Sequence, residues 1–249
     1  MIKKILTEAF VSADVGLSQH QLIEEIRGSV NKDKVIFCDF DGTMTVDDVV
    51  DKLLSEYGDE PWMEIEELWE AGKIGSETCL ILQLACIKHI TADDLMRFAS
   101  DMAIDPYLCE FVRFVRESSI DLYVLSDGFD CFIERILGNH GIASLPTFAN
   151  GLTIEDNKPI PSFPFKVGQC HSGSGMCKCA IIEKYRADRL VIYIGDGGSD
   201  KCAVRNADIV FAKGKLSNYC SANSIDFIEF SNFGDVMKFL IEKEKIDVI

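Results

Sequence analysis

Short apolar runs alternate with amphipathic stretches through most of the chain, from residue 34 onward. The runs at 35–38, 122–125 and 190–194 are rich in β-branched and aromatic residues, which is typical of strands buried on both faces of a parallel sheet. Between these runs, apolar residues recur at helical spacing. The alternation predicts an α/β fold, in which a parallel sheet carries helices on both faces.

The remaining elements of this core follow the same alternation. A proline-punctuated extended segment is expected at 152–165. Further strands are expected at 147–149, 209–211 and 226–230, and helices at 106–117, 129–137, 178–185, 199–206, 216–222 and 233–243.

The stretch 48–104 departs from the alternation, because it holds four amphipathic patterns and no strand. The first predicted helix ends at Gly58 and the second at Gly72, while Thr91 and Asp94 form a capping box that begins the fourth. Four helices between two core strands are typical of an inserted helical cap.

This pattern divides the chain into three predicted parts. Residues 1–30 form an N-terminal helical extension with two short helices, the core comprises 31–47 and 105–249, and the cap is 48–104. The extension carries apolar stripes but no candidate chemistry. A homodimer could form through the extension or the cap.

The composition and net charge of the chain limit the classes of molecule that it can bind. The formal net charge of -16 argues against nucleic acid and anionic membranes as partners, because both require basic surfaces. A small phosphorylated metabolite needs only local positive potential and remains compatible with this charge. The absence of a secretory pattern or a membrane-length apolar run, together with scattered cysteines, predicts a reduced cytoplasmic protein.

Two aspartates stand at the end of the first predicted strand. Asp39 and Asp41 are two positions apart and precede Gly42 and Thr43, where open α/β sheets bind ligands. Two carboxylates this close require a cation, a proton or a reaction that divides their roles. The plainer interpretation is a turn in which the aspartates cap a helix.

Three later features also follow predicted strands or loops. Ser126 and Asp127 begin a turn after 122–125, which suits an anion at a helix N-terminus or an ordinary helix cap. Lys178 opens an apolar helix. Asp196 and Asp200 form a second acidic pair within a glycine turn, and their oxygen ligands suit Mg²⁺.

The order of these residues resembles that of the motifs in the haloacid dehalogenase superfamily. The resemblance covers about 34–230 and implies a Rossmann-like core with a helical C1 cap, as in the phosphoserine phosphatase-like branch (subfamily IB). Within that branch, the run from Ser126 to Asp130 and the Cys-rich approach to Lys178 look closest to phosphatases of methionine salvage. Those enzymes act on 2-hydroxy-3-keto-5-methylthiopentenyl-1-phosphate. The matching motifs are Asp39-Phe40-Asp41-Gly42-Thr43, Ser126, Lys178 and Gly195-Asp196-Gly197-Gly198-Ser199-Asp200.

The resemblance implies a Mg²⁺-dependent phosphomonoester hydrolase that works through an aspartyl-phosphate. Asp39 would be the nucleophile and Asp41 the general acid and base. Mg²⁺ would bind the Asp39 carboxylate, the Asp41 main-chain oxygen and Asp196. The remaining roles are phosphate binding by Gly42, Thr43, Ser126, Asp127 and Lys178, and orientation of Lys178 or a metal-bound water by Asp200 from behind the site.

The cap is expected to choose the substrate. Phosphoserine phosphatases carry a glutamate nine positions after the nucleophile and a cap arginine, whereas this chain has Asp48 there and no arginine from 42 to 96. Phosphoserine therefore lacks its expected clamp, and an acidic cap also admits phosphocholine or phosphoethanolamine. A phosphotransferase or mutase, or a non-catalytic binding module, are the alternatives from other classes.

A cluster of soft ligands precedes and surrounds Lys178. Cys170, His171, Cys177 and Cys179 lie within ten positions and could bind zinc. Alternatively, Cys177 and Cys179 pack beneath the helix that begins with Lys178.

Overall fold

The computed structural model describes residues 33–142, 144–168, 170 and 173–246. The two helices expected within 1–30 lie outside these residues. The described strands form a seven-stranded sheet in the order β4-β3-β2-β1-β5-β6-β7. All neighbouring strands are parallel except β3 and β4, which pair antiparallel. The predicted α/β class is therefore confirmed.

The described elements have the following bounds. The strands are β1 (Lys34–Cys38), β2 (Asp121–Phe129), β3 (Thr147–Glu155), β4 (Lys158–Ser162), β5 (Leu190–Gly195), β6 (Ile209–Ala212) and β7 (Ile228–Glu229). The helices are α3 (Val49–Tyr57), α4 (Trp62–Glu70), α5 (Ser76–Leu84), α6 (Ala92–Asp101), α7 (Leu108–Glu117), α8 (Asp130–Asn139), α9 (Lys178–Tyr185), α10 (Gly214–Ala222) and α11 (Phe233–Ile246), with 3-10 turns η1 (Gly198–Lys201) and η2 (Ala203–Asn206).

Alternation along the central strand builds two hydrophobic layers. Ile36 and Cys38 of β1 belong to the core that contains the apolar faces of α7, α8 and α11. Val35 and Phe37 belong to the core on the opposite face, with α9 and α10. All four side chains are fully buried, which explains why the sequence of β1 is a continuous apolar run.

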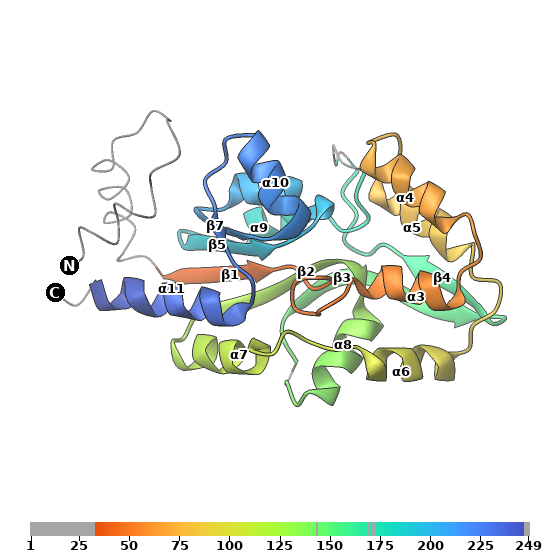
Figure 1. The fold of residues 1–249 in the computed structure, drawn as a ribbon, viewed down its shortest axis with the longest axis horizontal. Helices are drawn as coiled ribbons and strands as arrows, with labels where there is room; N and C mark the ends of the chain where they lie inside the picture. The colour runs from red at the N-terminus through yellow and green to blue at the C-terminus, as the bar shows by residue number, and fades with distance from the viewer. Residues whose placement is uncertain (1–32, 143, 169, 171–172, 247–249) are drawn as a thin grey trace. The chain divides into compact units, whose positions relative to one another are not determined.

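Helices α3 to α6 follow β1 without an intervening named strand, in the stretch predicted to be a cap. In Figure 1 they lie at the end of the sheet toward which β1 points. Helices α4 and α5 pack on each other, and α6 packs on α8. The expected capping box is present at α6, where Thr91 and Asp94 bond each other's backbone. The domain boundaries themselves remain predictions.

Three elements differ from the sequence interpretation. The extended segment contains a true strand, β4, at the sheet edge, where Pro159 and Pro161 need not donate hydrogen bonds to a second neighbour. The helix expected at 199–206 is two 3-10 turns. Strand β2 continues to Phe129 instead of ending at Leu125, with an irregular register against β3 between these two residues.

Candidate active site

The carboxyl end of β1 places Asp39 in a buried turn. Its backbone N–H extends the ladder to β5 by donating to Ile194 O (2.9 Å), and its Oδ1 accepts the Phe40 N–H (2.7 Å). Gly42 follows with φ of +69°, in the left-handed region that favours glycine. The Met44 N–H donates to Phe40 O (2.8 Å), which closes a tight turn between β1 and α3.

Lys178 lies at the N-terminus of α9 with its side chain 1% exposed. Its Nζ donates to Asp39 Oδ1 (2.8 Å), Asp200 Oδ1 (2.6 Å) and Ser199 Oγ (3.1 Å). Burial alone would lower the pKa of Lys178, but the Asp200 and Asp39 carboxylates outweigh it and raise that pKa above its ordinary value. Lys178 is therefore a fixed ammonium against Asp39.

The end of β5 supplies the second acidic pair. Thr43 Oγ1 donates to Asp196 Oδ1 (2.6 Å), which joins the two strand-end turns. Asp200 is fully buried, and its Oδ2 accepts the backbone N–H groups of Asp196 (3.1 Å) and Gly197 (3.0 Å). Burial, followed by the Asp200 charge, raises the pKa of Asp196 to about 6. These capping bonds explain why the segment after Gly197 forms tight 3-10 turns.

The aspartates form a group that fits a hard divalent cation. Asp39, Asp196 and Asp200 each offer a carboxylate oxygen, and these oxygens all lie within 4.8 Å of one another. Lys178 contacts two of these carboxylates, and the charge of Lys213 also acts on Asp196, so two ammonium groups face three carboxylates and the group is short of positive charge when all are ionised. An all-oxygen donor set suits Mg²⁺ or a similar ion. The expected main-chain ligand, Asp41 O, is not tested by this grouping and stays a prediction.

Asp41 lies across the site in contact with Ser126. Ser126 is fully buried; its Oγ donates to Asp41 Oδ2 (2.7 Å) and accepts the Gly128 N–H (2.9 Å). Burial, and then the nearby Asp48 charge, raise the pKa of Asp41 to about 7, against the lowering effect of the Ser126 hydrogen bond. A carboxyl group with this pKa can both give and take a proton near neutrality.

The Asp127 carboxylate binds neighbouring residues of the fold, while phosphate binding by the Asp127 N–H stays a prediction. Its oxygens accept hydrogen bonds from Asn150 Nδ2, Ser174 Oγ and the Met176 N–H, each at 3.2 Å. The side chain thus ties β2 to β3 and to the segment that leads into Lys178. Sequence reasoning missed Asn150, Ser174 and Met176, because nothing in their local pattern shows that they meet Asp127.

The stretch predicted to be a cap contributes acidic groups near Asp41. Asp48 caps α3 by accepting the Asp51 N–H (3.0 Å), and the charges of Asp51 and Glu66 act on it. From α4, the Trp69 ring approaches Gly198 so closely that a Cβ there would lie 3.1 Å from Trp69 Cη2. The predicted cap residue Asp48 therefore belongs to an acidic group beside the proposed acid and base.

The thiols around Lys178 form two pairs. Cys170 is in hydrogen-bonding contact with Cys177, and Cys179 with Cys202, a residue that sequence reasoning did not include. Within the described residues, the only group that gathers three metal-ligand atoms is the aspartate group and not a set of thiols. His171 lies outside the described residues, so zinc binding with that ligand stays a prediction.

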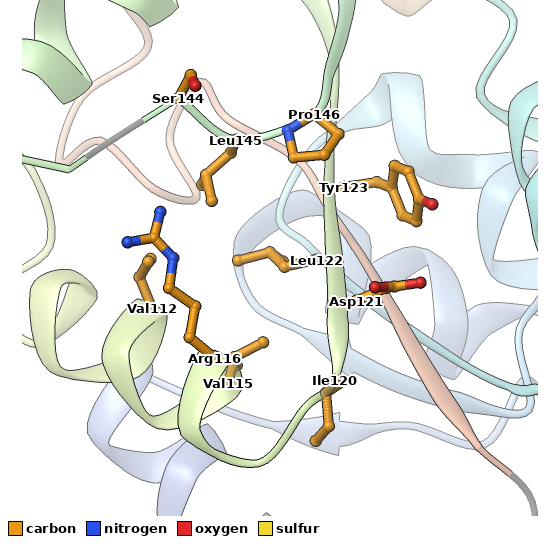
Figure 2. A pocket seen from close by; sticks show the side chains of 10 residues that line it. All are labelled: Val112, Val115, Arg116, Ile120, Asp121, Leu122, Tyr123, Ser144, Leu145 and Pro146. Carbon is orange, nitrogen blue, oxygen red and sulfur yellow. The ribbon is translucent and has the colours of Figure 1, made fainter.

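A separate hollow lies at the other end of β2. Figure 2 shows the residues that line it, between α7 and the start of that strand. Its volume is about 200 Å³, and its lining combines apolar side chains such as Val115, Ile120 and Leu122 with polar ones. Arg116 and Asp121 are its charged residues. Because Asp39 follows the last residue of β1 and Ser126 lies in the second half of β2, this hollow at the start of β2 is distinct from the candidate site.

Comparison with known proteins identifies the family. The profile of a family described as Putative Phosphatase matches residues 34–223. The chain belongs to this phosphatase family. The resemblance to the haloacid dehalogenase superfamily is therefore confirmed, and the chain is a phosphatase of that fold.

Relatives within this phosphatase group cover most of the chain. A protein of Brevibacillus brevis named 2-hydroxy-3-keto-5-methylthiopentenyl-1-phosphate phosphatase is 29% identical over 214 residues, which span 85% of this chain and 96% of the relative. A protein of the same name from Bacillus mycoides is 30% identical over 216 residues, with 83% and 97% covered.

Solved structures agree on the fold. A phosphoserine phosphatase, solved as an analogue of its phospho-aspartyl intermediate, superposes with a TM-score of 0.66 at 21% identity and covers 84% of this chain and 99% of that one. At this identity, the similarity shows the fold alone. In the described part of this phosphatase, no helix is long and apolar enough to cross a membrane.

Proposed function

We propose that this phosphatase hydrolyses a phosphomonoester through a phosphorylated Asp39. Asp39 attacks phosphorus as the ester P–O bond breaks, and Asp41 gives its proton to the leaving oxygen. Asp41 then takes a proton from water, whose oxygen attacks the phosphoryl group and releases Asp39 and inorganic phosphate. The observation that supports this proposal most directly is the Lys178 ammonium, 2.8 Å from Asp39 Oδ1 in a buried setting.

The surrounding groups would stabilise charge on the transferring oxygens. We assign this to Lys178 and the Asp127 N–H, together with the Gly42 N–H and the hydroxyls of Thr43 and Ser126. In the structure, the Gly42 N–H donates to Thr45 Oγ1 (3.0 Å), and the two hydroxyls donate to Asp196 Oδ1 (2.6 Å) and Asp41 Oδ2 (2.7 Å), so these three donors would exchange partners when phosphate binds. We propose Mg²⁺ as the resident ion, held by the carboxylates of Asp39 and Asp196 and the main-chain oxygen of Asp41. Bound there, it would neutralise the repulsion between the anionic nucleophile and the anionic ester.

The proposed substrate is 2-hydroxy-3-keto-5-methylthiopentenyl-1-phosphate, the compound in the names of the relatives that match most of the chain. Phosphoserine is less favoured, because the segment 42–96 offers no arginine for its carboxylate. Phosphocholine or phosphoethanolamine is the second candidate, since Asp48, Asp51 and Glu66 place negative charge beside Asp41. Initial rates on a panel of these esters with Mg²⁺ would rank them.

The mechanism is tested by Asp39→Asn, which keeps the side-chain volume and removes the nucleophile. We expect Mg²⁺-dependent release of phosphate from an aryl phosphate to disappear, with an unchanged circular dichroism spectrum. Asp156→Asn, in the exposed turn between β3 and β4, is the matched control and should retain wild-type rates. Substantial turnover by Asp39→Asn would refute the mechanism.

Assembly and location are separate proposals. A homodimer through the N-terminal extension or the cap remains a prediction, as does a cytoplasmic location. Light scattering of the full chain during size-exclusion chromatography would measure the mass of the assembly directly.

A further inference from the structure

Tyr193 is a buried tyrosine behind the proposed catalytic groups. It lies on β5, three positions before Asp196, and its side chain is fully buried among the residues that pack α9 and α10 on the sheet. Its hydroxyl donates to Asp200 Oδ1. The same oxygen accepts the Lys178 ammonium at 2.6 Å.

Asp200 is held by four donors, and Tyr193 is one of them. On Oδ1 these are the Tyr193 hydroxyl and Lys178 Nζ; on Oδ2 they are the backbone N–H groups of Asp196 and Gly197. A carboxylate has about four lone-pair sites, so this set fixes both its position and its rotation. Asp200 in turn determines where Lys178 lies relative to Asp39.

The packing around this contact leaves little room for rearrangement. A Cβ on Gly195 would overlap Asp200 Oδ2 and would lie 2.9 Å from Tyr193 Cε1. The glycine that ends β5 is thus required for the tyrosine ring and the carboxylate to approach the same stretch of backbone. Close packing of this kind transmits a change at the ring directly to Asp200.

We propose that Tyr193 is a positioning residue for phosphoryl transfer, acting through Asp200 to hold the Lys178 ammonium against the attacking Asp39. The inference rests on the proposed function, because it assumes that Lys178 stabilises charge in the transition state. Tyr193 does not touch the substrate. Its hydroxyl supplies the donor that prevents the Asp200 carboxylate from turning away from Lys178.

The test is Tyr193→Phe in the full chain with Mg²⁺ and an aryl phosphate. The ring volume is kept, so only the hydroxyl contact is lost. We expect kcat to fall about 10- to 100-fold with KM within about twofold, since the lost positioning acts in the transition state. Tyr123→Phe is the matched control: its ring stacks on Phe37, and no hydrogen bond of its hydroxyl is found in the described part of the chain.

A double-mutant cycle separates positioning from a general structural role. In an Asp200→Asn background, Tyr193→Phe should lower kcat by less than about twofold, because the group through which it acts has already been altered. An unchanged kcat in the single variant, or equal effects in both backgrounds, would overturn the inference. If Asp39→Asn abolishes turnover while Tyr193→Phe does not alter it, the proposed function survives and only the role of Tyr193 fails.

Discussion

Gly42 lies where the turn after β1 packs against Asp196 in the turn after β5. With φ of +69°, a Cβ at this position would lie 2.7 Å from Asp196 Oδ2. The glycine therefore permits both the left-handed turn and the approach of the two acidic segments. Gly72 has nearly the same φ, +68°, but nothing lies within 4 Å of its Cβ position.

A comparison of alanine variants at Gly42 and Gly72 separates the effect of backbone strain from the effect of crowding against Asp196. Both alanine variants should lose about 1 kcal/mol of stability from the left-handed backbone. Only Gly42→Ala should also displace Asp196, lowering kcat at least tenfold and raising the Mg²⁺ concentration needed for half-maximal activity. Thermal unfolding and Mg²⁺ titration of activity would measure the two effects, and equal kinetics for both variants would contradict the prediction.

Asp48 acts on Asp41 through charge. After burial, the Asp48 carboxylate is the next contributor to the raised pKa of Asp41. Asp48→Asn keeps a good helix N-cap but removes that charge, so it should lower the pKa of Asp41. Asp41 would then lose its proton at a lower pH than in the wild type. Because the protonated Asp41 donates to the leaving oxygen, the basic limb of the pH profile of kcat/KM should also move to lower pH.

The control for this shift is Asp47→Asn. Asp47 is the adjacent acidic residue; it is exposed and its carboxylate pairs with Lys52 Nζ at 3.2 Å. Its profile should match that of the wild type. A basic limb that stays in place or moves upward in Asp48→Asn would show that the two carboxylates are not coupled in the working enzyme.

At the scale of elements, α5 meets the segment that leads into α9. The Glu77 N–H donates to Gly173 O (3.2 Å), and Ser76 Oγ donates to Ser174 Oγ (3.4 Å). A Cβ on Gly75 would lie 2.5 Å from Gly173 O. Since Ser174 also binds Asp127, the predicted cap touches the same segment that leads into Lys178, the proposed catalytic lysine.

Gly75→Ala should push α5 away from this segment. Crowding of a backbone oxygen typically costs about 1–3 kcal/mol, and we expect both a lower melting temperature and a several-fold higher KM. Gly168→Ala is the control, because nothing lies within 4 Å of its Cβ position. If the two variants have the same KM, this contact does not contribute to substrate binding.

The sequence predicted elements best where a single local pattern determines them. The apolar run of β1 and the capping box of α6 are of this kind. The 3-10 turns after Gly197 were not predictable, because they depend on Asp200 folding back onto backbone N–H groups. Strand β4 was also missed, because its prolines argue against a strand in the sequence and its pairing depends on the partner strand β3.

The residues of the candidate site also divide into those that a local sequence pattern predicts and those that only the folded structure reveals. Motif order identified Asp39, Asp41, Lys178 and Asp196, because each follows a recognisable strand or opens a helix. Tyr193 was not recognisable, since a tyrosine within an apolar strand has the pattern of any core residue. Its partner becomes visible only when β5 and the following turn are folded together.

For the whole molecule, metal binding should be linked to stability. A cation held by Asp39 and Asp196 would relieve the repulsion among Asp39, Asp196 and Asp200, and it would bind only the folded chain. At a Mg²⁺ concentration about 100-fold above Kd, the expected stabilisation is about 2.7 kcal/mol. Thermal unfolding with Mg²⁺ and with a chelator would measure this difference.

Asp196→Asn provides the comparison for this linkage. It removes one ligand charge and should abolish most of the Mg²⁺-dependent rise in melting temperature, without lowering the stability of the metal-free protein. Asp156→Asn, outside the site, should keep the full rise. An equal rise in Asp196→Asn would place the stabilising ion elsewhere.

The contact of Lys178 with both Asp39 and Asp200 has a consequence for how metal binding would activate the enzyme. The lysine is a built-in counter-ion for Asp39 and Asp200, so part of the negative charge of the site is balanced before any metal binds. The metal would then bind to and dissociate from a chain that is already folded. Activity would follow the free concentration of the ion, and enzyme that has lost its metal would regain activity on addition of the ion without refolding.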